Sequence, residues 1–357
     1  MTSMSCLATG LLPGLVVAAT VAQGADPAPL FASHDIIDVT VDAPLTTLMD
    51  ERPDRSELKG SFAWTEADGS AMRVAVKLRT RGNYRRAKHH CDFAPIRLNF
   101  RKSEVAGTGF DGQDRLKLVT HCRTGEREFR AIVLREYLAY RLFRELTDVG
   151  YSVRLLNITY FDTETENAFT RYAFVIEDDK AMARRTDLEL VERRGVSHED
   201  HDRVRQNLVN VFQYMIGNTE YSFVNPEPGE ECCHNADLLS ADGEPPYFAV
   251  PFDFDFSGLA EAPYAQPNPK YPIKLVRTRY YKGLCANNDV LPATLGLFRD
   301  RREAIFGVID ELKSLPGAGA TAARKARRYI EDFYEILDDP AAVEAKLVAR
   351  CLAPGED

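Results

Sequence analysis

The chain has 357 residues, of which 45% are apolar and 28% charged, and its formal net charge at pH 7 is −9. This apolar content can fill the core of one large domain or of two lobes, which excludes intrinsic disorder for most of the chain. The acidic balance argues against a nucleic-acid-binding protein that attracts phosphate at long range. A local basic cluster is nevertheless present at Arg79, Arg81, Arg85, Arg86 and Lys88.

Residues 1–24 carry no charged side chain and resemble a cleaved secretory signal peptide. The apolar stretch at 7–22 is shorter than the ~20 residues of a membrane span, and Ala22-Gln23-Gly24 has the small-x-small pattern of a cleavage site. The alternative is an ordinary apolar helix at the N-terminus. Because no later segment suits a membrane span, the sequence predicts a secreted or periplasmic protein.

Alternating apolar residues predict strands in the N-terminal part at 74–78, 96–100, 116–118, 153–160 and 169–176. Apolar residues at helical spacing predict one prominent helix over 132–143. Residues 25–180 are therefore expected to form an antiparallel β-rich lobe.

The C-terminal part, residues 181–357, is expected to be a mainly helical lobe that packs tightly on the first. An apolar helix is predicted over 202–216, ending at Gly217 and Asn218. Two short strands are predicted at 236–239 and 247–250, and three helices between residues 291 and 351.

Six cysteines follow the predicted signal peptide: Cys91, Cys122, Cys232, Cys233, Cys285 and Cys351. An even number in an exported chain favours disulfides, and no CxxC-like spacing suggests a zinc site. The alternative is free thiols in a cytoplasmic protein. Cys91 and Cys122 lie near the ends of two predicted neighbouring strands and are expected to pair. Adjacent cysteines do not easily bond to each other, so we expect the second bridge to join the 232–233 pair to Cys285.

The most distinctive local pattern is PFDFDFSG at residues 251–258. In an extended segment, Asp253 and Asp255 would project to one side and the phenylalanines to the other. Two carboxylates on one side suit a hard cation such as Mg²⁺. The alternative is a turn in which the aspartates cap backbone amides.

A polar loop, GNTEYS at residues 217–222, directly follows the apolar helix. Glu220 in this loop can serve as a general base or orient a hydroxyl nucleophile, whereas the simpler interpretation is a helix cap with a surface turn. Asn235 precedes a predicted strand and offers an amide oxygen to a metal, although an asparagine there is usually a turn residue.

The succession of helix, polar loop, asparagine, strand and paired aspartates is the order that protein kinases use for their catalytic loop and metal-binding aspartate. Lys117 on a predicted strand and Glu136 on a predicted helix match the lysine–glutamate pair that holds ATP phosphates in such proteins. Their charged groups are then expected within salt-bridge distance, or within one rotamer change of it. The alternative is two surface charges. The absence of a Gly-x-Gly-x-x-Gly loop excludes an ordinary eukaryotic-type kinase.

Five segments within residues 70–290 form a recognisable series: Arg79-x-Arg81-Gly82-Asn83, PIRLNF, LREYLAYRLF, GNTEYS and PFDFDFSG. Taken together, these segments resemble the spore coat protein H (CotH) kinase family, and the part from the polar loop to the aspartates is also similar to HipA-type kinases. The resemblance implies an α+β, divergent two-lobed protein-kinase-like fold, with a β-rich N-terminal lobe and a helical C-terminal lobe.

The resemblance also implies transfer of the ATP γ-phosphoryl group to a Ser or Thr hydroxyl of a protein, with Mg²⁺ or Mn²⁺. It places Lys117 at the ATP phosphates and Arg81 among the residues that bind the cofactor, and Glu136 would orient Lys117. Glu220 stands where the family has an aspartate and would receive or orient the acceptor hydroxyl. The longer side chain of glutamate moves the carboxylate by about one methylene. A displacement on that scale can lower a catalytic rate ~100-fold, so this difference is expected to reduce activity.

The metal ligands implied by the resemblance are Asp253, Asp255 and Asn235. Asn225 is the rival of Asn235, because it lies five residues after Glu220. A pseudokinase or envelope binding protein without phosphotransfer is the alternative function. A nucleotide-sugar transferase is a third hypothesis, but the chain lacks the βαβ pattern of such enzymes. No nucleic-acid partner and no membrane span are expected.

Overall fold

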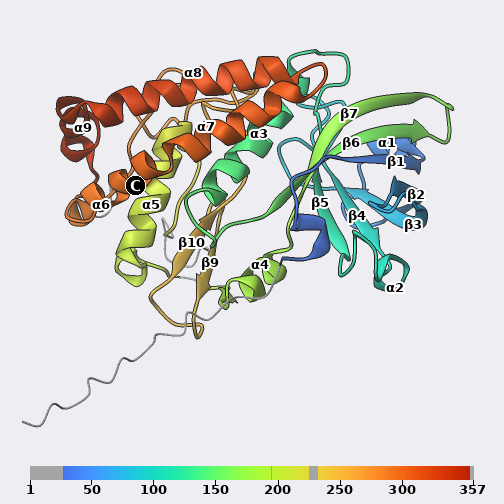
Figure 1. Ribbon diagram of the computed structural model, residues 1–357, viewed down its shortest axis with the longest axis horizontal. Helices are drawn as coiled ribbons and strands as arrows, with labels where there is room; N and C mark the ends of the chain where they lie inside the picture. The colour runs from blue at the N-terminus through green and yellow to red at the C-terminus, as the bar shows by residue number, and fades with distance from the viewer. Residues whose placement is uncertain (1–26, 194, 225–231, 354–357) are drawn as a thin grey trace, which may run out of the picture.

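The computed structural model describes residues 27–193, 195–224 and 232–353 (Figure 1). The predicted signal peptide and Asn225 lie outside these residues. Two parts lie side by side in Figure 1, a β-barrel and a mainly helical part.

Seven strands close into a barrel in the order β1-β2-β3-β4-β5-β7-β6: β1 (Ile37–Ala43), β2 (Leu58–Thr65), β3 (Ala71–Thr80), β4 (Ile96–Phe100), β5 (Arg115–Val119), β6 (Val153–Asp162) and β7 (Ala168–Ile176). Neighbouring strands are antiparallel except β1 and β6, which pair in parallel from Ile37 opposite Leu156 to Ala43 opposite Asp162. Alternate side chains fill the interior, among them Val41, Phe62 and Leu98.

The expected two-lobed protein-kinase-like fold is wrong, because the closed mixed barrel replaces the open β-sheet of such an N-terminal lobe. The sequence analysis predicts no strand in residues 37–43 or 58–65, and these segments form β1 and β2. β1 closes the barrel by bonding both β2 and β6. Closure leaves no unpaired edge, and strand periodicity by itself does not reveal it.

The helical part contains α4 (Asp179–Arg185), α5 (Arg203–Ile216), α6 (Leu291–Asp300), α7 (Arg302–Glu311), α8 (Gly319–Asp338) and α9 (Pro340–Lys346). A small antiparallel sheet of order β10-β9-β8 lies beside α4 and α5, with β8 (Glu189–Val191), β9 (Ala236–Ser240) and β10 (Phe248–Pro251). The short helices α1 (Leu45–Glu51) and α2 (Lys102–Val105) flank the barrel. The tail after residue 290 thus has more helices than the three expected.

Helix α3 (Phe129–Arg144) joins the two parts, and nearly all of its residues are buried. It contacts β6 and β7 of the barrel on one side and α7 and α8 on the other. The predicted strands β3 to β7 and the predicted helices α3 and α5 are confirmed within a few residues at each end. Side chains of α3 are therefore in a position to reach a site at the junction.

The cysteines pair as Cys91–Cys122, Cys285–Cys351 and Cys232–Cys233. The first pair is confirmed, with Cα atoms 4.7 Å apart. The expected bridge from the 232–233 pair to Cys285 is wrong, as is the expectation that the two adjacent cysteines do not bond. Leu284 pairs with Leu352, and this contact from the C-terminal end of the chain places Cys351 beside Cys285.

The three cysteine pairs fit an oxidising compartment. None of the helices in the described residues is long and apolar enough to span a bilayer.

Candidate functional site

A cavity of about 50 Å³ lies at the junction of the barrel and the helical part. Its lining consists of Arg81, Arg85, Lys117, Val119, Glu136, Tyr140, Tyr151, Ile176, Phe252 and Asp253. Four of the residues implied by the sequence therefore line the same cavity: Arg81, Lys117, Glu136 and Asp253. Glu220, Asn235 and Asp255 lie outside this lining.

Arg85 is the centre of the charged groups at this cavity. Its Nη1 and Nη2 lie 3.0 and 3.1 Å from the two carboxylate oxygens of Glu136. Its Nε lies 3.3 Å from Asp255, and Nη2 lies 3.5 Å from Asp253. Burial lowers the pKa of Arg85, but the surrounding carboxylates raise it well above its usual value. A buried guanidinium with several carboxylate partners holds the loop after β3, α3 and the aspartate segment together.

Lys117 and Glu136 line the same cavity but form no ion pair with each other, so the expectation that one rotamer change would bring them together stays a prediction. Glu136 bonds Arg85 instead. The Nζ atom of Lys117 lies 3.9 Å from Asp179 and 5.8 Å from the centre of the Tyr151 ring. Arg85 thus occupies the place beside Glu136 that the sequence analysis gave to Lys117. Arg85 belongs to the basic cluster noticed in the sequence, but composition does not reveal which member of that cluster turns inward.

The two aspartates differ in environment. β10 ends at Pro251, and Asp253 has a left-handed φ of 59°, so the segment is not extended, although the metal-site interpretation assumed an extended segment. Asp255 is buried, bonds Arg85 and accepts a hydrogen bond from the Tyr264 hydroxyl at 2.9 Å. Burial and the nearby carboxylates raise the pKa of Asp255 well above its usual value, against the opposing effect of Arg85. The side chain of Asp253 is 47% exposed, so it is the aspartate with room for a further ligand.

Backbone contacts bring the polar loop and Asn235 beside the aspartate segment. The amide of Asn235 donates to the Glu220 carbonyl at 2.8 Å, and the Phe252 N–H donates to the Asn235 carbonyl at 3.0 Å. The carboxylate of Glu220 is 34% exposed and lies 3.7 Å from His234. Burial raises the pKa of Tyr84, and the negative charges of Asp255 and Glu220 raise it further. Tyr84 therefore lies near both carboxylates.

A glycine at the end of α5 fixes where this loop begins. Gly217 has φ 64°, and a Cβ there would lie 2.0 Å from the Tyr329 hydroxyl oxygen. Its carbonyl accepts from the Gly258 N–H at 3.0 Å, so the loop after α5 and the segment after Asp255 are bonded to each other. A side chain at position 217 would separate them.

The described residues contain no group of three or more His, Cys, Asp or Glu side chains that could hold a metal ion. A metal at Asp253 would therefore take its remaining oxygen ligands from water or from a bound phosphate, which is how Mg²⁺ usually binds beside one or two carboxylates. The amide nitrogen of Asn235 donates to the Glu220 carbonyl, so the side-chain oxygen of Asn235 is the atom that it could offer to a metal.

A second cavity has a volume of about 340 Å³, and two of its lining residues contact residues that line the first. Its lining consists of Asp179, Leu190, Val191, Glu192, Arg193, Cys232, Ala236, Asp237 and Leu238. Two contacts connect the cavity walls: the Tyr151 hydroxyl donates to Asp237, and Lys117 lies near Asp179. Burial raises the pKa of Asp237, and the Tyr151 hydrogen bond and the charge of Lys117 partly offset this rise. The sequence analysis missed this cavity, because its walls come from α4, β8 and β9.

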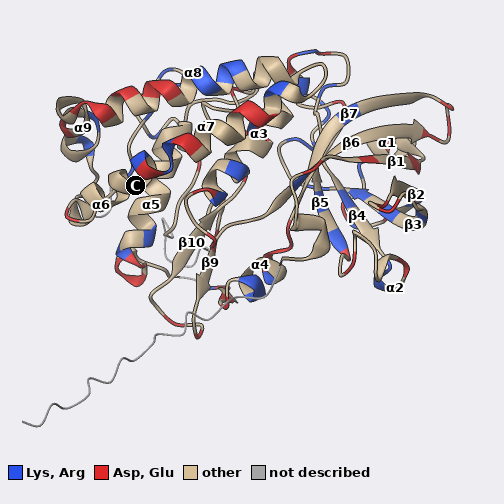
Figure 2. Ribbon diagram, in the orientation of Figure 1, with Lys and Arg blue, Asp and Glu red and all other residues tan. Residues whose placement is uncertain are grey.

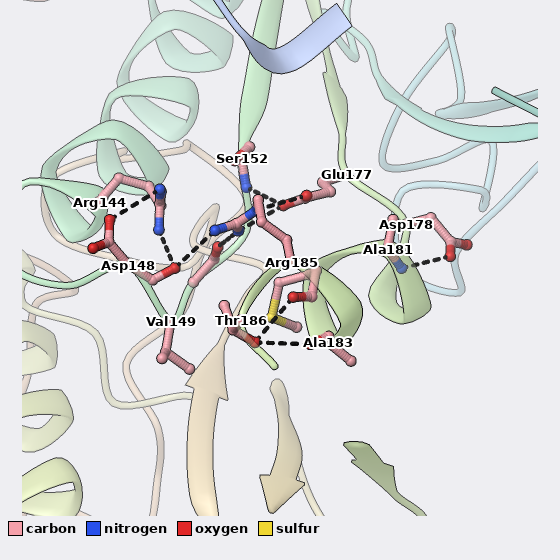
Figure 3. A network of polar contacts seen from close by, with 12 residues as sticks. Arg144, Asp148, Val149, Ser152, Glu177, Asp178, Ala181, Ala183, Arg185 and Thr186 are labelled. Carbon is pink, nitrogen blue, oxygen red and sulfur yellow. Dashed lines mark hydrogen bonds and ion pairs between the residues drawn. The ribbon is translucent and has the colours of Figure 1, made fainter. Parts of the chain in front are cut away.

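The polar network in Figure 3 holds α4 in place beside this cavity. Arg185 donates to both carboxylate oxygens of Glu177 at 2.9 Å, and Glu177 accepts from the Ser152 N–H at 2.9 Å. Asp178 caps the first turn of α4 by accepting from Lys180 and Ala181. The end of β7, the start of β6 and α4 therefore form one bonded unit that positions Asp179.

No family model matches the chain, and no curated protein matches its sequence. The function of the site is therefore argued from its geometry and from the chemistry of its residues.

Proposed function

We propose that this protein is a secreted or periplasmic phosphotransferase that binds ATP with a divalent cation at the two neighbouring cavities. The observation that carries the proposal is that the Arg81 side chain has no partner at the cavity. Its half-buried side chain lines the small cavity, yet within the described residues it has no hydrogen-bond or ion-pair partner. Burial lowers the pKa of Arg81, because charge in that place is poorly compensated. A bound phosphate would supply the missing partner.

The half-exposed carboxylate of Asp253 complements this cation. Asp253 lines the same cavity, and it raises the pKa of Arg81 against the effect of burial. A divalent cation bridging Asp253 and a polyphosphate would neutralise both, and Mg²⁺ or Mn²⁺ would thus polarise the phosphate for transfer. Asn235 would add an amide oxygen. Arg81 and Lys117 would bind the phosphates, and Glu136 would help to fix the site by pairing with Arg85.

The larger cavity suits the base and ribose. Its volume of about 340 Å³ falls within the usual range of ligand cavities, and Leu190, Val191 and Leu238 give it apolar walls. Lys117 lies between the two cavities and would contact the phosphates of a nucleotide that spans them.

Glu220 would receive or orient the hydroxyl of a protein acceptor. Its carboxylate is partly exposed, and the Asn235 amide that bonds its carbonyl fixes the loop next to the aspartate segment. The resemblance to the CotH family implies the same activity. The oxidised cysteine pairs support secretion, because such pairs persist in oxidising compartments.

The test uses the purified protein with Mg²⁺, ATP and casein. We expect a thermal shift with Mg²⁺–ATP and phosphotransfer to casein, and both are expected to fall in Arg81→Ala. A matched control is Arg324→Ala, which removes an exposed arginine on α8. Absence of any nucleotide-dependent shift in the unaltered protein would contradict the proposal. A shift without phosphotransfer would indicate the alternative, a nucleotide-binding protein without catalysis.

A further inference from the structure

Six cations occupy neighbouring outward positions on strands β2 to β5, and we call this set the basic face: Lys59, Lys77, Arg79, Arg97, Arg115 and Lys117. They alternate with buried residues such as Val76, Leu78 and Leu98, which fill the barrel. Since successive side chains of a strand point to opposite faces, the cations point away from the core. Figure 2 shows Lys and Arg in blue on these strands.

Like charges lie directly opposite each other across the strands of the basic face. Lys59 pairs in register with Lys77, and Arg97 lies between Arg79 and Lys117. Directly opposed like charges destabilise a sheet. The whole chain carries a net charge of −9, so this concentration of positive charge does not follow from composition. An anionic ligand would offset the repulsion.

Much of this charge has no partner inside the protein. Lys59, Lys77 and Arg115 are exposed, and their side chains have no hydrogen-bond or ion-pair partner in the part of the chain that the structure describes. The Nε atom of Arg97 is buried without an acceptor. The Glu57 carboxylate, which lies close by, accepts both of its hydrogen bonds from Asn99.

The character of the face selects among polyanions. The large exposed hydrophobic residues among those described are Ile36, Tyr84, Val204 and Leu275, none of which belongs to strands β2 to β5. The face therefore lacks the aromatic platform on which single-stranded nucleic acid stacks, and it lacks the apolar anchors of a membrane-binding surface. Recognition by charge alone suits a flexible acidic polypeptide.

We propose that the basic face binds an acidic segment of the protein acceptor. Lys117 belongs both to this face and to the lining of the small cavity, so a chain lying on the face leads towards the transfer site. That the acidic chain is a phosphate acceptor rests on the proposed phosphotransfer. The binding of an acidic chain can be measured without nucleotide, and it stands or fails separately.

The probe is a fluorescently labelled poly-L-glutamate peptide, and its binding to the full chain is followed by anisotropy. The variant Lys59→Gln/Lys77→Gln/Arg115→Gln removes three exposed charges from the face. The matched control Arg324→Gln/Arg328→Gln/Lys346→Gln removes three exposed charges from α8 and α9. We expect the face variant to bind about tenfold more weakly, from the sum of three exposed ion pairs, and the control to bind as the unaltered protein does. Binding should also weaken as salt rises through ~0.1 M, because exposed charges are then screened beyond ~10 Å.

Three results would overturn the inference. The first is that poly-L-glutamate does not bind at low salt. The second is that the face variant and the control lose the same amount of affinity for it. The third is that a single-stranded oligonucleotide or phosphatidylserine vesicles bind the basic face more tightly than poly-L-glutamate does. Unchanged thermal unfolding of both variants shows that lost binding is not lost folding. If phosphotransfer is present, the face variant is expected to raise KM for an acidic acceptor and leave kcat unchanged. Failure of ATP binding with retained peptide binding would overturn the proposed function alone.

Discussion

The guanidinium of Arg85 and the carboxylate of Glu136 form a two-point ion pair at the centre of the site, with N–O distances of 3.0 and 3.1 Å. Both side chains are buried. The pair joins the loop after β3 to α3, and through Asp253 and Asp255 it also holds the segment after β10. The arrangement of the site therefore depends on a cation that does not itself need to touch a ligand.

Removing one partner of this pair is expected to destabilise the protein strongly. Arg85→Met should lower the free energy of unfolding by about 3–5 kcal/mol, because it leaves buried carboxylates without a cation. Urea unfolding with far-UV circular dichroism measures the change. The double variant Arg85→Met/Glu136→Leu should be less destabilised than Arg85→Met alone, since it removes one of the stranded charges. A double variant less stable than the single one would contradict this role for the pair.

Asp253 and Asp255 should separate cleanly in mutagenesis. Asp253→Asn is expected to abolish the Mg²⁺-dependent part of the nucleotide thermal shift and leave unfolding of the free protein nearly unchanged, because its side chain is about half exposed. Asp255→Asn should instead lower the free energy of unfolding by about 1–3 kcal/mol, since it removes the charge that pairs with buried Arg85 and weakens the buried hydrogen bond from Tyr264. The reverse assignment of the two effects would show that Asp255 is the ligand.

Gly217→Ala tests how the end of α5 positions Glu220. We expect a loss of stability above the ~1–2 kcal/mol of a left-handed residue, because the new Cβ would also meet the Tyr329 hydroxyl at 2.0 Å. Adding Tyr329→Phe removes the oxygen atom of the clash and should restore part of the loss. Thermal unfolding of the single and double variants decides the matter. Phosphotransfer should fall in Gly217→Ala even at temperatures where the variant is folded.

Acid should destabilise the protein through His121. Burial, followed by Arg171 and Arg130, lowers the pKa of His121 from 6.5 to about 3. The unfolded chain therefore binds a proton at this residue between these pH values and the folded protein does not. This contribution to stability is complete above pH 6.5 and is lost as the pH falls towards 3.

The measurement is urea unfolding at several pH values between 6.5 and 4. His121→Phe should make the decline in stability over this range shallower by up to ~1.4 kcal/mol per pH unit. His89→Phe is the control, because His89 is exposed. An identical pH profile for His121→Phe and the unaltered protein would contradict this origin of the acid sensitivity.

Periodicity in the sequence was sufficient to predict the strands β3 to β7 and the helices α3 and α5, because each buries one face or nearly all of its surface. The motifs selected Arg81, Lys117, Glu136 and Asp253, which the fold brings to one cavity, and they also selected Glu220, Asn235 and Asp255, which lie outside its lining. These signals are local, and they survive in a single sequence. The pairing of Cys91 with Cys122 also followed from predicted neighbouring strands.

Only the tertiary structure decided the closure of the barrel, the partner of Glu136 and the bridge from Cys285 to Cys351. Each depends on contacts between segments far apart in the chain, such as β1 with β6 or Arg85 with α3. Many cations in the chain could pair with Glu136 on grounds of charge, and the backbone path after β3 is what brings Arg85 into the interior. Local propensity and spacing carry no information about such paths, because they describe which face of an element is apolar and not which element that face meets.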